Sequence, residues 1–132
     1  MDENAALVRR LYEAFNRRDT EATRGLMDPE IEWVNAEEAV EPGTRHGFDE
    51  YQDALRRVRE VFRDAEIELD HLVESGDRVA TRVRMHAHLD ASGMDTTMPQ
   101  SHLWTFREGK AVRFEWSPDP EHAFRGLSDS SS

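Results

Sequence analysis

At 132 residues the chain has room for one domain with a single hydrophobic core, and 37% of its residues are apolar. Its 28 acidic and 17 basic residues give a net charge of −11, which repels phosphate backbones and anionic membranes and so argues against nucleic-acid and membrane partners. The absence of cysteine excludes disulfides, thiolate nucleophiles and cysteine-ligated zinc. An acidic N-terminal stretch and the lack of a long apolar run predict a soluble, cytoplasmic protein.

The first half of the chain predicts three helices. Apolar side chains recur at helical spacing over residues 4–18 and 48–62, with charged residues between them. A shorter helix is expected over residues 20–27, because Asp19 or Thr20 can cap its start and the following Asp-Pro pair ends it. The apolar faces of the two long helices need a second layer to pack against.

Strands dominate the rest of the sequence. The predicted strands cover residues 30–37, 66–77, 78–90, 100–107 and 110–117, with a loop at 37–47 and a turn at 91–98. A last short helix is expected over residues 119–127, with Asp119 as its N-cap and Gly126 as its stop. We expect one domain at residues 1–127 and a disordered tail at 128–132. Early helices followed by antiparallel strands predict an α+β fold.

The last two strands form a hairpin whose turn determines which side chains share a face. With the turn at Glu108-Gly109, His102 lies opposite Glu115. Both side chains then point to the same side of the sheet as Trp104 and Gln100. Trp116 and its neighbours of the same parity are expected on the opposite side.

The strand at 78–90 has one uncharged face and one face of arginines and histidines. The uncharged residues are Val79, Thr81, Val83, Met85, Ala87 and Leu89. The uncharged face is expected to be protected from solvent, whereas the charged face is exposed to solvent or lies at a subunit interface. A turn about Ser92-Gly93 places Val83 beside His102 and Met85 beside Gln100, so that His102 and Gln100 join the protected face.

A buried histidine beside a buried glutamate is a candidate acid–base site. The carboxylate favours the imidazolium and raises the histidine pKa, while burial opposes this shift. Such pairs occur in general acid–base catalysis. The same pair can also be a structural hydrogen bond between strands, so the pattern leaves both roles for His102 and Glu115 open.

Three stretches resemble the SnoaL-like branch of the nuclear transport factor 2-like (NTF2-like) superfamily. They are LVRRLYEAFNRRDTEATRGLMDPEIEWVNAE, RHGFDEYQDAL and SHLWTFREGKAVRFEWSPDPEHAFRGL, and the resemblance extends over residues 4–127. It implies a cone-shaped α+β barrel in which a curved antiparallel or mixed sheet wraps around helices. It also implies an apolar pocket and a homodimer formed through the outer face of the sheet. The superfamily includes polyketide cyclases, ketosteroid isomerases and non-catalytic binders, so the activity stays open.

The catalytic residues of these relatives transfer to the chain only in part. The resemblance places His102 where ketosteroid isomerases carry an acid that donates a hydrogen bond to the substrate oxyanion. At the end of the first strand, where their general base lies, this chain has Val34 and Asn35, and neither is a base. SnoaL-type cyclases carry an acidic residue near Ser117, and Glu115 is the nearest substitute.

We therefore expect a protein that binds a small, apolar, oxygenated molecule, with cofactor-independent acid–base catalysis of the cyclase or isomerase type by His102 and Glu115. The expected ligand-binding residues are Tyr12, Phe15, Trp33, Asn35, Tyr51, Val83, Met85, Gln100 and Trp104. No cofactor is expected, and the His86-x-His88 pair lacks a third metal ligand. The alternative is a non-catalytic ligand-binding or dimerisation module. A dehydratase or hydrolase would need a second acid.

Overall fold

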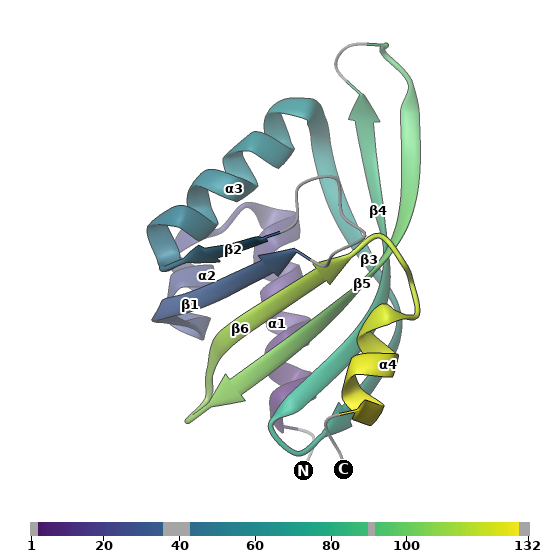
Figure 1. Ribbon diagram of the computed structural model, residues 1–132. Coiled ribbons are helices and arrows are strands. Elements are labelled where there is room, and N and C mark those ends of the chain that lie inside the picture. The colour runs from purple at the N-terminus through teal and green to yellow at the C-terminus, as the bar shows by residue number, and fades with distance from the viewer. Residues whose placement is uncertain (1–2, 36–42, 90–91, 130–132) are drawn as a thin grey trace.

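The computed structural model describes residues 3–35, 43–89 and 92–129 (Figure 1). The helices are α1 (Glu3–Arg17), α2 (Thr20–Leu26), α3 (Phe48–Val61) and α4 (His122–Asp129). The strands are β1 (Met27–Asn35), β2 (Gly43–His46), β3 (Phe62–Ser75), β4 (Arg78–Leu89), β5 (Asp95–Arg107) and β6 (Lys110–Ser117). Among the described residues, no helix combines the length and apolarity that crossing a membrane requires.

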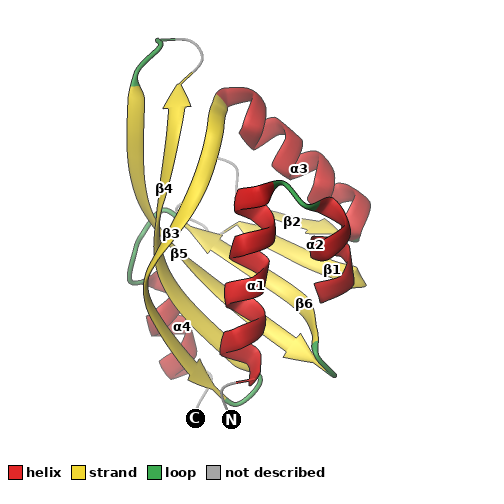
Figure 2. Cartoon of the chain, turned by 180° about the vertical axis from the view of Figure 1, so that it is seen from behind, coloured by secondary structure: helices red, strands yellow, loops and turns green. Residues whose placement is uncertain are grey.

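The strands form one curved, open sheet in the order β2-β1-β6-β5-β4-β3. β1 and β6 run parallel, and all other neighbours are antiparallel. Helices α1, α2 and α3 lie against one face, whereas α4 lies against the other (Figures 1 and 2). The α+β class and the curved, mixed sheet around helices agree with the sequence-based expectation.

The end of α1 has an unusual residue at a position that normally favours glycine. Arg18 has a positive φ of 55°, and its N–H donates to the Phe15 carbonyl oxygen over 3.1 Å. The next N–H, that of Asp19, donates to the Ala14 carbonyl oxygen over 2.9 Å, which completes a Schellman-type ending. The Asp19 side chain then accepts from the Ala22 N–H and caps α2, as predicted.

Several elements differ from the sequence-based expectation. The predicted loop at 37–47 contains the strand β2, which pairs with the edge of β1 through backbone hydrogen bonds and shows no apolar alternation that could reveal it. The rest of that loop lies outside the described residues. β3 begins directly after α3, and β5 begins inside the predicted turn. Each extension pairs with a neighbouring strand, β3 with the end of β4 and β5 with the same end of β4.

The final helix also differs, since it starts at His122 and passes through Gly126. The Asp119 carboxylate still accepts from the Glu121 N–H before the helix begins. Gly126 is therefore wrong as a stop. A Cβ atom there would lie 3.3 Å from Leu103, so the glycine lets α4 pack closely on β5. The helix extends to Asp129, so the expected tail at 128–132 starts inside it.

The predicted protected face of β4 is confirmed. Val79, Thr81 and Val83 are fully buried, whereas the arginines and histidines on the other face of β4 are partly exposed. The pairing with β5 differs by two residues from the expected register, because Thr81 lies opposite His102 and Val83 opposite Gln100. An even shift preserves the parity of the side chains, so His102 and Gln100 still lie on the protected face.

Candidate functional site

A β-bulge in the last hairpin changes which residues face the helices. The pairs Phe106 with Ala111 and Thr105 with Arg113 leave Val112 as an extra residue on β6. Beyond this bulge the side chains of β6 point to the faces opposite to those predicted, because one inserted residue reverses the alternation. His102 therefore lies opposite Trp116 rather than Glu115.

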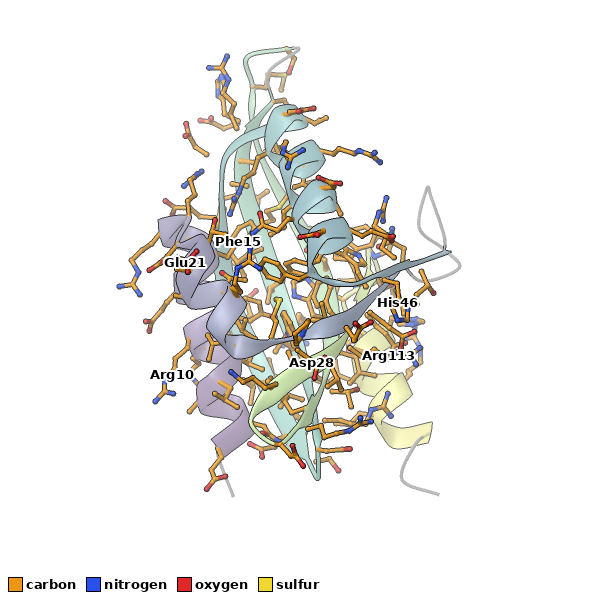
Figure 3. The ribbon with its side chains drawn as sticks, turned by 90° about the vertical axis from the view of Figure 1, so that its left-hand side faces the viewer. Arg10, Phe15, Glu21, Asp28, His46 and Arg113 are labelled. Carbon is orange, nitrogen blue, oxygen red and sulfur yellow. The ribbon has the colours of Figure 1, made fainter. Side chains whose placement is uncertain are left out.

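The predicted pair of His102 and Glu115 is thus wrong. Glu115 pairs with Leu103 on the outer face, where its Oε2 lies 3.5 Å from Nη2 of Arg78. Arg113 also turns outward, and in Figure 3 it lies on the α4 side of the sheet while Phe15 lies on the α1 side. A carboxylate on the outer face cannot set the charge of a histidine on the inner face.

A cavity of about 680 Å³ lies between the inner face of the sheet and helices α1 and α3. The residues expected from the sequence that line it are Tyr12, Phe15, Trp33, Asn35, Tyr51, Met85, Gln100, His102 and Trp104. Val83 does not line it, since this side chain is fully buried in the core. The cavity brings together residues from α1, α2, α3 and all six strands of the sheet.

Three aromatic residues of the cavity wall were not predicted from the sequence, namely Phe62, Phe114 and Trp116. Trp116 was expected to point away from the cavity, but the bulge turns it inward. Only the position of the extra residue Val112 distinguishes the two outcomes, and no residue of that stretch demands a bulge. Four arginines also line the cavity without having been predicted, because charged residues between the apolar positions of a helix are usually solvated.

A chain of buried hydrogen bonds forms the polar floor of the cavity. The Tyr12 hydroxyl lies 2.7 Å from the Thr81 hydroxyl and 2.8 Å from Nδ1 of His102. The indole N–H of Trp104 donates to the same hydroxyl over 3.0 Å. On the other side of the ring, Nε2 of His102 lies 2.9 Å from Oε1 of Gln100.

The Trp116 indole determines which atoms donate and which accept in the hydrogen bonds of Gln100 and His102. Its indole N–H can only donate, and it does so to Oε1 of Gln100 over 2.9 Å. The amide oxygen therefore occupies that position, and Nε2 of His102 must also donate to it. Burial lowers the pKa of His102 to about 3, so the ring is neutral and its Nδ1 accepts a hydrogen bond from Tyr12.

The Gln100 amide is left with its nitrogen as the group that a ligand can reach. Its oxygen accepts two hydrogen bonds, from His102 and Trp116, which uses both lone pairs. Among the described residues, no atom accepts a hydrogen bond from the amide nitrogen. This nitrogen is not one of the completely buried polar atoms that lack a hydrogen-bond partner. Since Gln100 lines the cavity, its N–H groups are donors without a protein acceptor.

The family model for the SnoaL-like domain matches residues 8–114 of this sequence. The chain belongs to the SnoaL-like family. The predicted family and fold class are therefore confirmed, with an open rather than a closed sheet.

Solved structures share this SnoaL-like fold. An NTF2-like protein from Burkholderia pseudomallei is 30% identical with a TM-score of 0.79, over 95% of this chain and 97% of that chain. TerC, co-crystallised with polyporic acid, is 29% identical with a TM-score of 0.77, over 96% and 98%. A candidate SnoaL-like polyketide cyclase from a Jannaschia species is 18% identical with a TM-score of 0.77, over 86% and 83%, which shows the fold alone. No curated protein matches the chain.

The walls of the SnoaL-like cavity are aromatic. The rings of Trp33 and Tyr51 are 5.1 Å apart, and Phe114 meets Trp33 edge-on at the same distance. The Trp33 indole N–H donates to Oδ1 of Asn35 over 2.6 Å, which fixes the amide at the end of β1. Burial raises the pKa of Tyr51, so its hydroxyl stays protonated. Flat apolar surfaces of this kind favour a flat apolar ligand.

The SnoaL-like chain has no cluster of three or more metal-ligating side chains within residues 3–35, 43–89 and 92–129. His86 and His88 lie on the outer side of β4, away from the cavity. His86 pairs with Glu68 over 2.8 Å, and His88 pairs with Asp95 over 3.0 Å. Each histidine therefore has its own acidic partner.

Proposed function

We propose that the protein binds a small, flat, apolar molecule and that a carbonyl or enol oxygen of this ligand accepts a hydrogen bond from the Gln100 amide. The observation that carries the proposal is the fixed orientation of this amide, with its oxygen occupied by His102 and Trp116 and its nitrogen left for the cavity. A buried donor without an acceptor favours ligands that supply one.

The proposal gives His102 a positioning role in place of acid–base chemistry. Both of its ring nitrogens are hydrogen-bonded, and its pKa of about 3 makes it a weak base at neutral pH. Glu115 lies on the other face, and Asp19 is the carboxylate that lines the cavity among the described residues. The Gln100 N–H could still stabilise an oxyanion that forms on a bound carbonyl compound. Cyclase- or isomerase-type catalysis therefore stays a second proposal beside non-catalytic binding.

One of the similar structures fits this ligand class. TerC was co-crystallised with polyporic acid, and the candidate polyketide cyclase adds support for the fold alone. This ligand belongs to TerC. It supports oxygenated compounds as the first set to test on this chain.

The experiment compares two ligands that differ only in a carbonyl group, acetylnaphthalene and ethylnaphthalene. Each competes against the fluorescent apolar probe N-phenylnaphthylamine, and the inhibition constants give the preference for the carbonyl. We expect the native protein to prefer acetylnaphthalene by about five- to tenfold, the value of one neutral hydrogen bond. In Gln100→Leu this preference should disappear while ethylnaphthalene still binds.

Glu115→Gln is the matched control, because this residue lies on the outer face and does not line the cavity. It should leave both inhibition constants unchanged. Equal binding of the two naphthalenes by the native protein would contradict the role of Gln100. A failure of N-phenylnaphthylamine to bind would contradict the ligand-binding function as a whole. A measurement of whether bound compounds are converted to products then distinguishes catalysis from binding alone.

The homodimer expected through the outer face of the sheet is also a proposal. In Figure 1, α4 covers the lower part of this face and leaves the upper part of β4 and β5 open. Light scattering coupled to gel filtration gives the mass in solution and tests it, with a monomer as the contradicting result.

A further inference from the structure

The charge around the cavity is opposite to the charge of the chain as a whole. The net charge is −11, yet four arginines line the cavity, namely Arg18, Arg45, Arg57 and Arg59. Among the described lining residues the single carboxylate is that of Asp19, which caps α2. An arginine-rich rim around an apolar cavity in an acidic protein attracts anions to that place.

Arg59, on α3, is the most confined of these arginines. Its guanidinium lies 4.9 Å from the centre of the Phe15 ring, and Nη2 donates to the Phe15 carbonyl oxygen over 3.3 Å. Its Nε is buried and has no acceptor among the described residues. Burial lowers the pKa of Arg59, and the neighbouring charge of Arg18 lowers it further. Among the described residues, no carboxylate forms an ion pair with this guanidinium.

Arg18 approaches the same place from the end of α1. It adopts a left-handed backbone conformation that favours glycine, so the arginine side chain at the rim of the cavity is present at a cost in backbone strain. It forms an ion pair with Asp64 at 3.9 Å, and because Asp64 is nine-tenths exposed this pair is weak. Arg18 is six residues after Tyr12, about 9 Å further along the axis of α1.

We infer that the ligand of this cavity is an anion: an apolar body whose carboxylate or ionised phenol or enol group binds to Arg59 and Arg18. This inference rests on the proposed function and specifies the ligand class. The apolar body lies against the aromatic walls, and the anionic group supplies a counter-charge to the guanidinium of Arg59, which pairs with no carboxylate among the described residues. Arginine suits this role because its planar donors pair with two oxygens at once.

Arg59 has a second role that the test must separate from ligand binding. Its hydrogen bond to the Phe15 carbonyl satisfies one of the terminal acceptors of α1 and joins α3 to α1. If Arg59 did only this, a substitution would lower stability without changing the preference between charged and uncharged ligands. The decisive quantity is therefore a ratio of two affinities in the same variant.

The experiment uses anilinonaphthalenesulfonate, which is an anion, and N-phenylnaphthylamine, which has the same rings without the sulfonate. Both probes are titrated into the full-length protein and followed by fluorescence, with thermal unfolding as a check on folding. The native protein should bind the anion more tightly. In Arg59→Gln the affinity for the anion should fall about tenfold while that for the neutral probe stays within twofold, because one charge-assisted hydrogen bond is lost.

Arg56→Gln is the matched control on the same helix. Arg56 is exposed, pairs with Asp53 and does not line the cavity, so its substitution removes the same charge without changing either affinity. Arg18→Gly is a second variant in case Arg59→Gln fails to fold, and it should weaken the anion several-fold. If both probes bind the native protein equally, or if Arg59→Gln and Arg18→Gly leave the ratio unchanged, the inference is overturned while the proposed binding function survives. If neither probe binds, the binding function itself fails.

Discussion

The Tyr12 hydroxyl donates a hydrogen bond to Nδ1 of His102 over 2.8 Å, and it accepts one from the Trp104 indole over 3.0 Å. Removing this hydroxyl leaves a buried acceptor and a buried donor without partners. Tyr12→Phe should therefore lower the free energy of unfolding by about 2–3 kcal/mol in urea denaturation.

Tyr51→Phe is the comparison for this prediction. Tyr51 is as buried as Tyr12 and lines the same cavity, but no described residue hydrogen-bonds to its hydroxyl. Its replacement should change the free energy of unfolding by less than about 1 kcal/mol. Similar losses in the two variants would show that the hydroxyl network around His102 contributes nothing specific.

The burial of His102 predicts a pH dependence of stability. In the unfolded chain a histidine titrates near pH 6.5, whereas burial holds the pKa of His102 to about 3 in the folded protein. Between these values the unfolded state binds the extra proton, so the free energy of unfolding falls as the pH falls below about 6.5. At about pH 4.5 the loss from this residue should reach about 2–3 kcal/mol.

Carboxyl groups also lose stabilising interactions in acid, so His102 needs a difference measurement. A hydrogen bond from Arg84 lowers the pKa of Asp70, and the backbone N–H of Glu121 lowers that of Asp119. Both carboxylates are unchanged in His102→Gln, a variant that does not titrate at this position. Urea denaturation at about pH 7 and pH 4.5 should show a steeper loss in the native protein than in the variant. Equal slopes would contradict a neutral, buried His102.

Arg18→Gly separates binding from stability. Glycine adopts the left-handed conformation at the end of α1 without steric cost, so the variant should gain about 0.5–1 kcal/mol in the free energy of unfolding. The lost contact with Asp64 is exposed and costs little. A variant that is more stable and yet binds the anionic probe less tightly identifies Arg18 as a ligand-binding residue. A loss of stability would contradict the strain at this position.

Sequence patterns were sufficient for the faces of β4 and for the inward position of His102, because period-two alternation survives an even shift in register. They were insufficient for β6, where one extra residue at Val112 reverses the alternation for Phe114, Glu115 and Trp116. The hydrogen-bond network around His102 could not be predicted from the sequence for a related reason. The partner of His102 comes from α1, and helix periodicity alone does not say which strand residue a tyrosine meets.

The bulge itself can be tested by deleting Val112. Without the extra residue, Arg113 follows Ala111 directly, so Thr105 still lies opposite Arg113 and His102 opposite Trp116, and Phe114 and Trp116 stay on the cavity wall. We expect the deletion variant to keep cooperative urea unfolding and to lose no more than about 3 kcal/mol in the free energy of unfolding. Val112→Ala keeps the bulge and should cost no more than about 1–2 kcal/mol. A deletion variant that no longer unfolds cooperatively would contradict the view that Val112 is the one extra residue of β6.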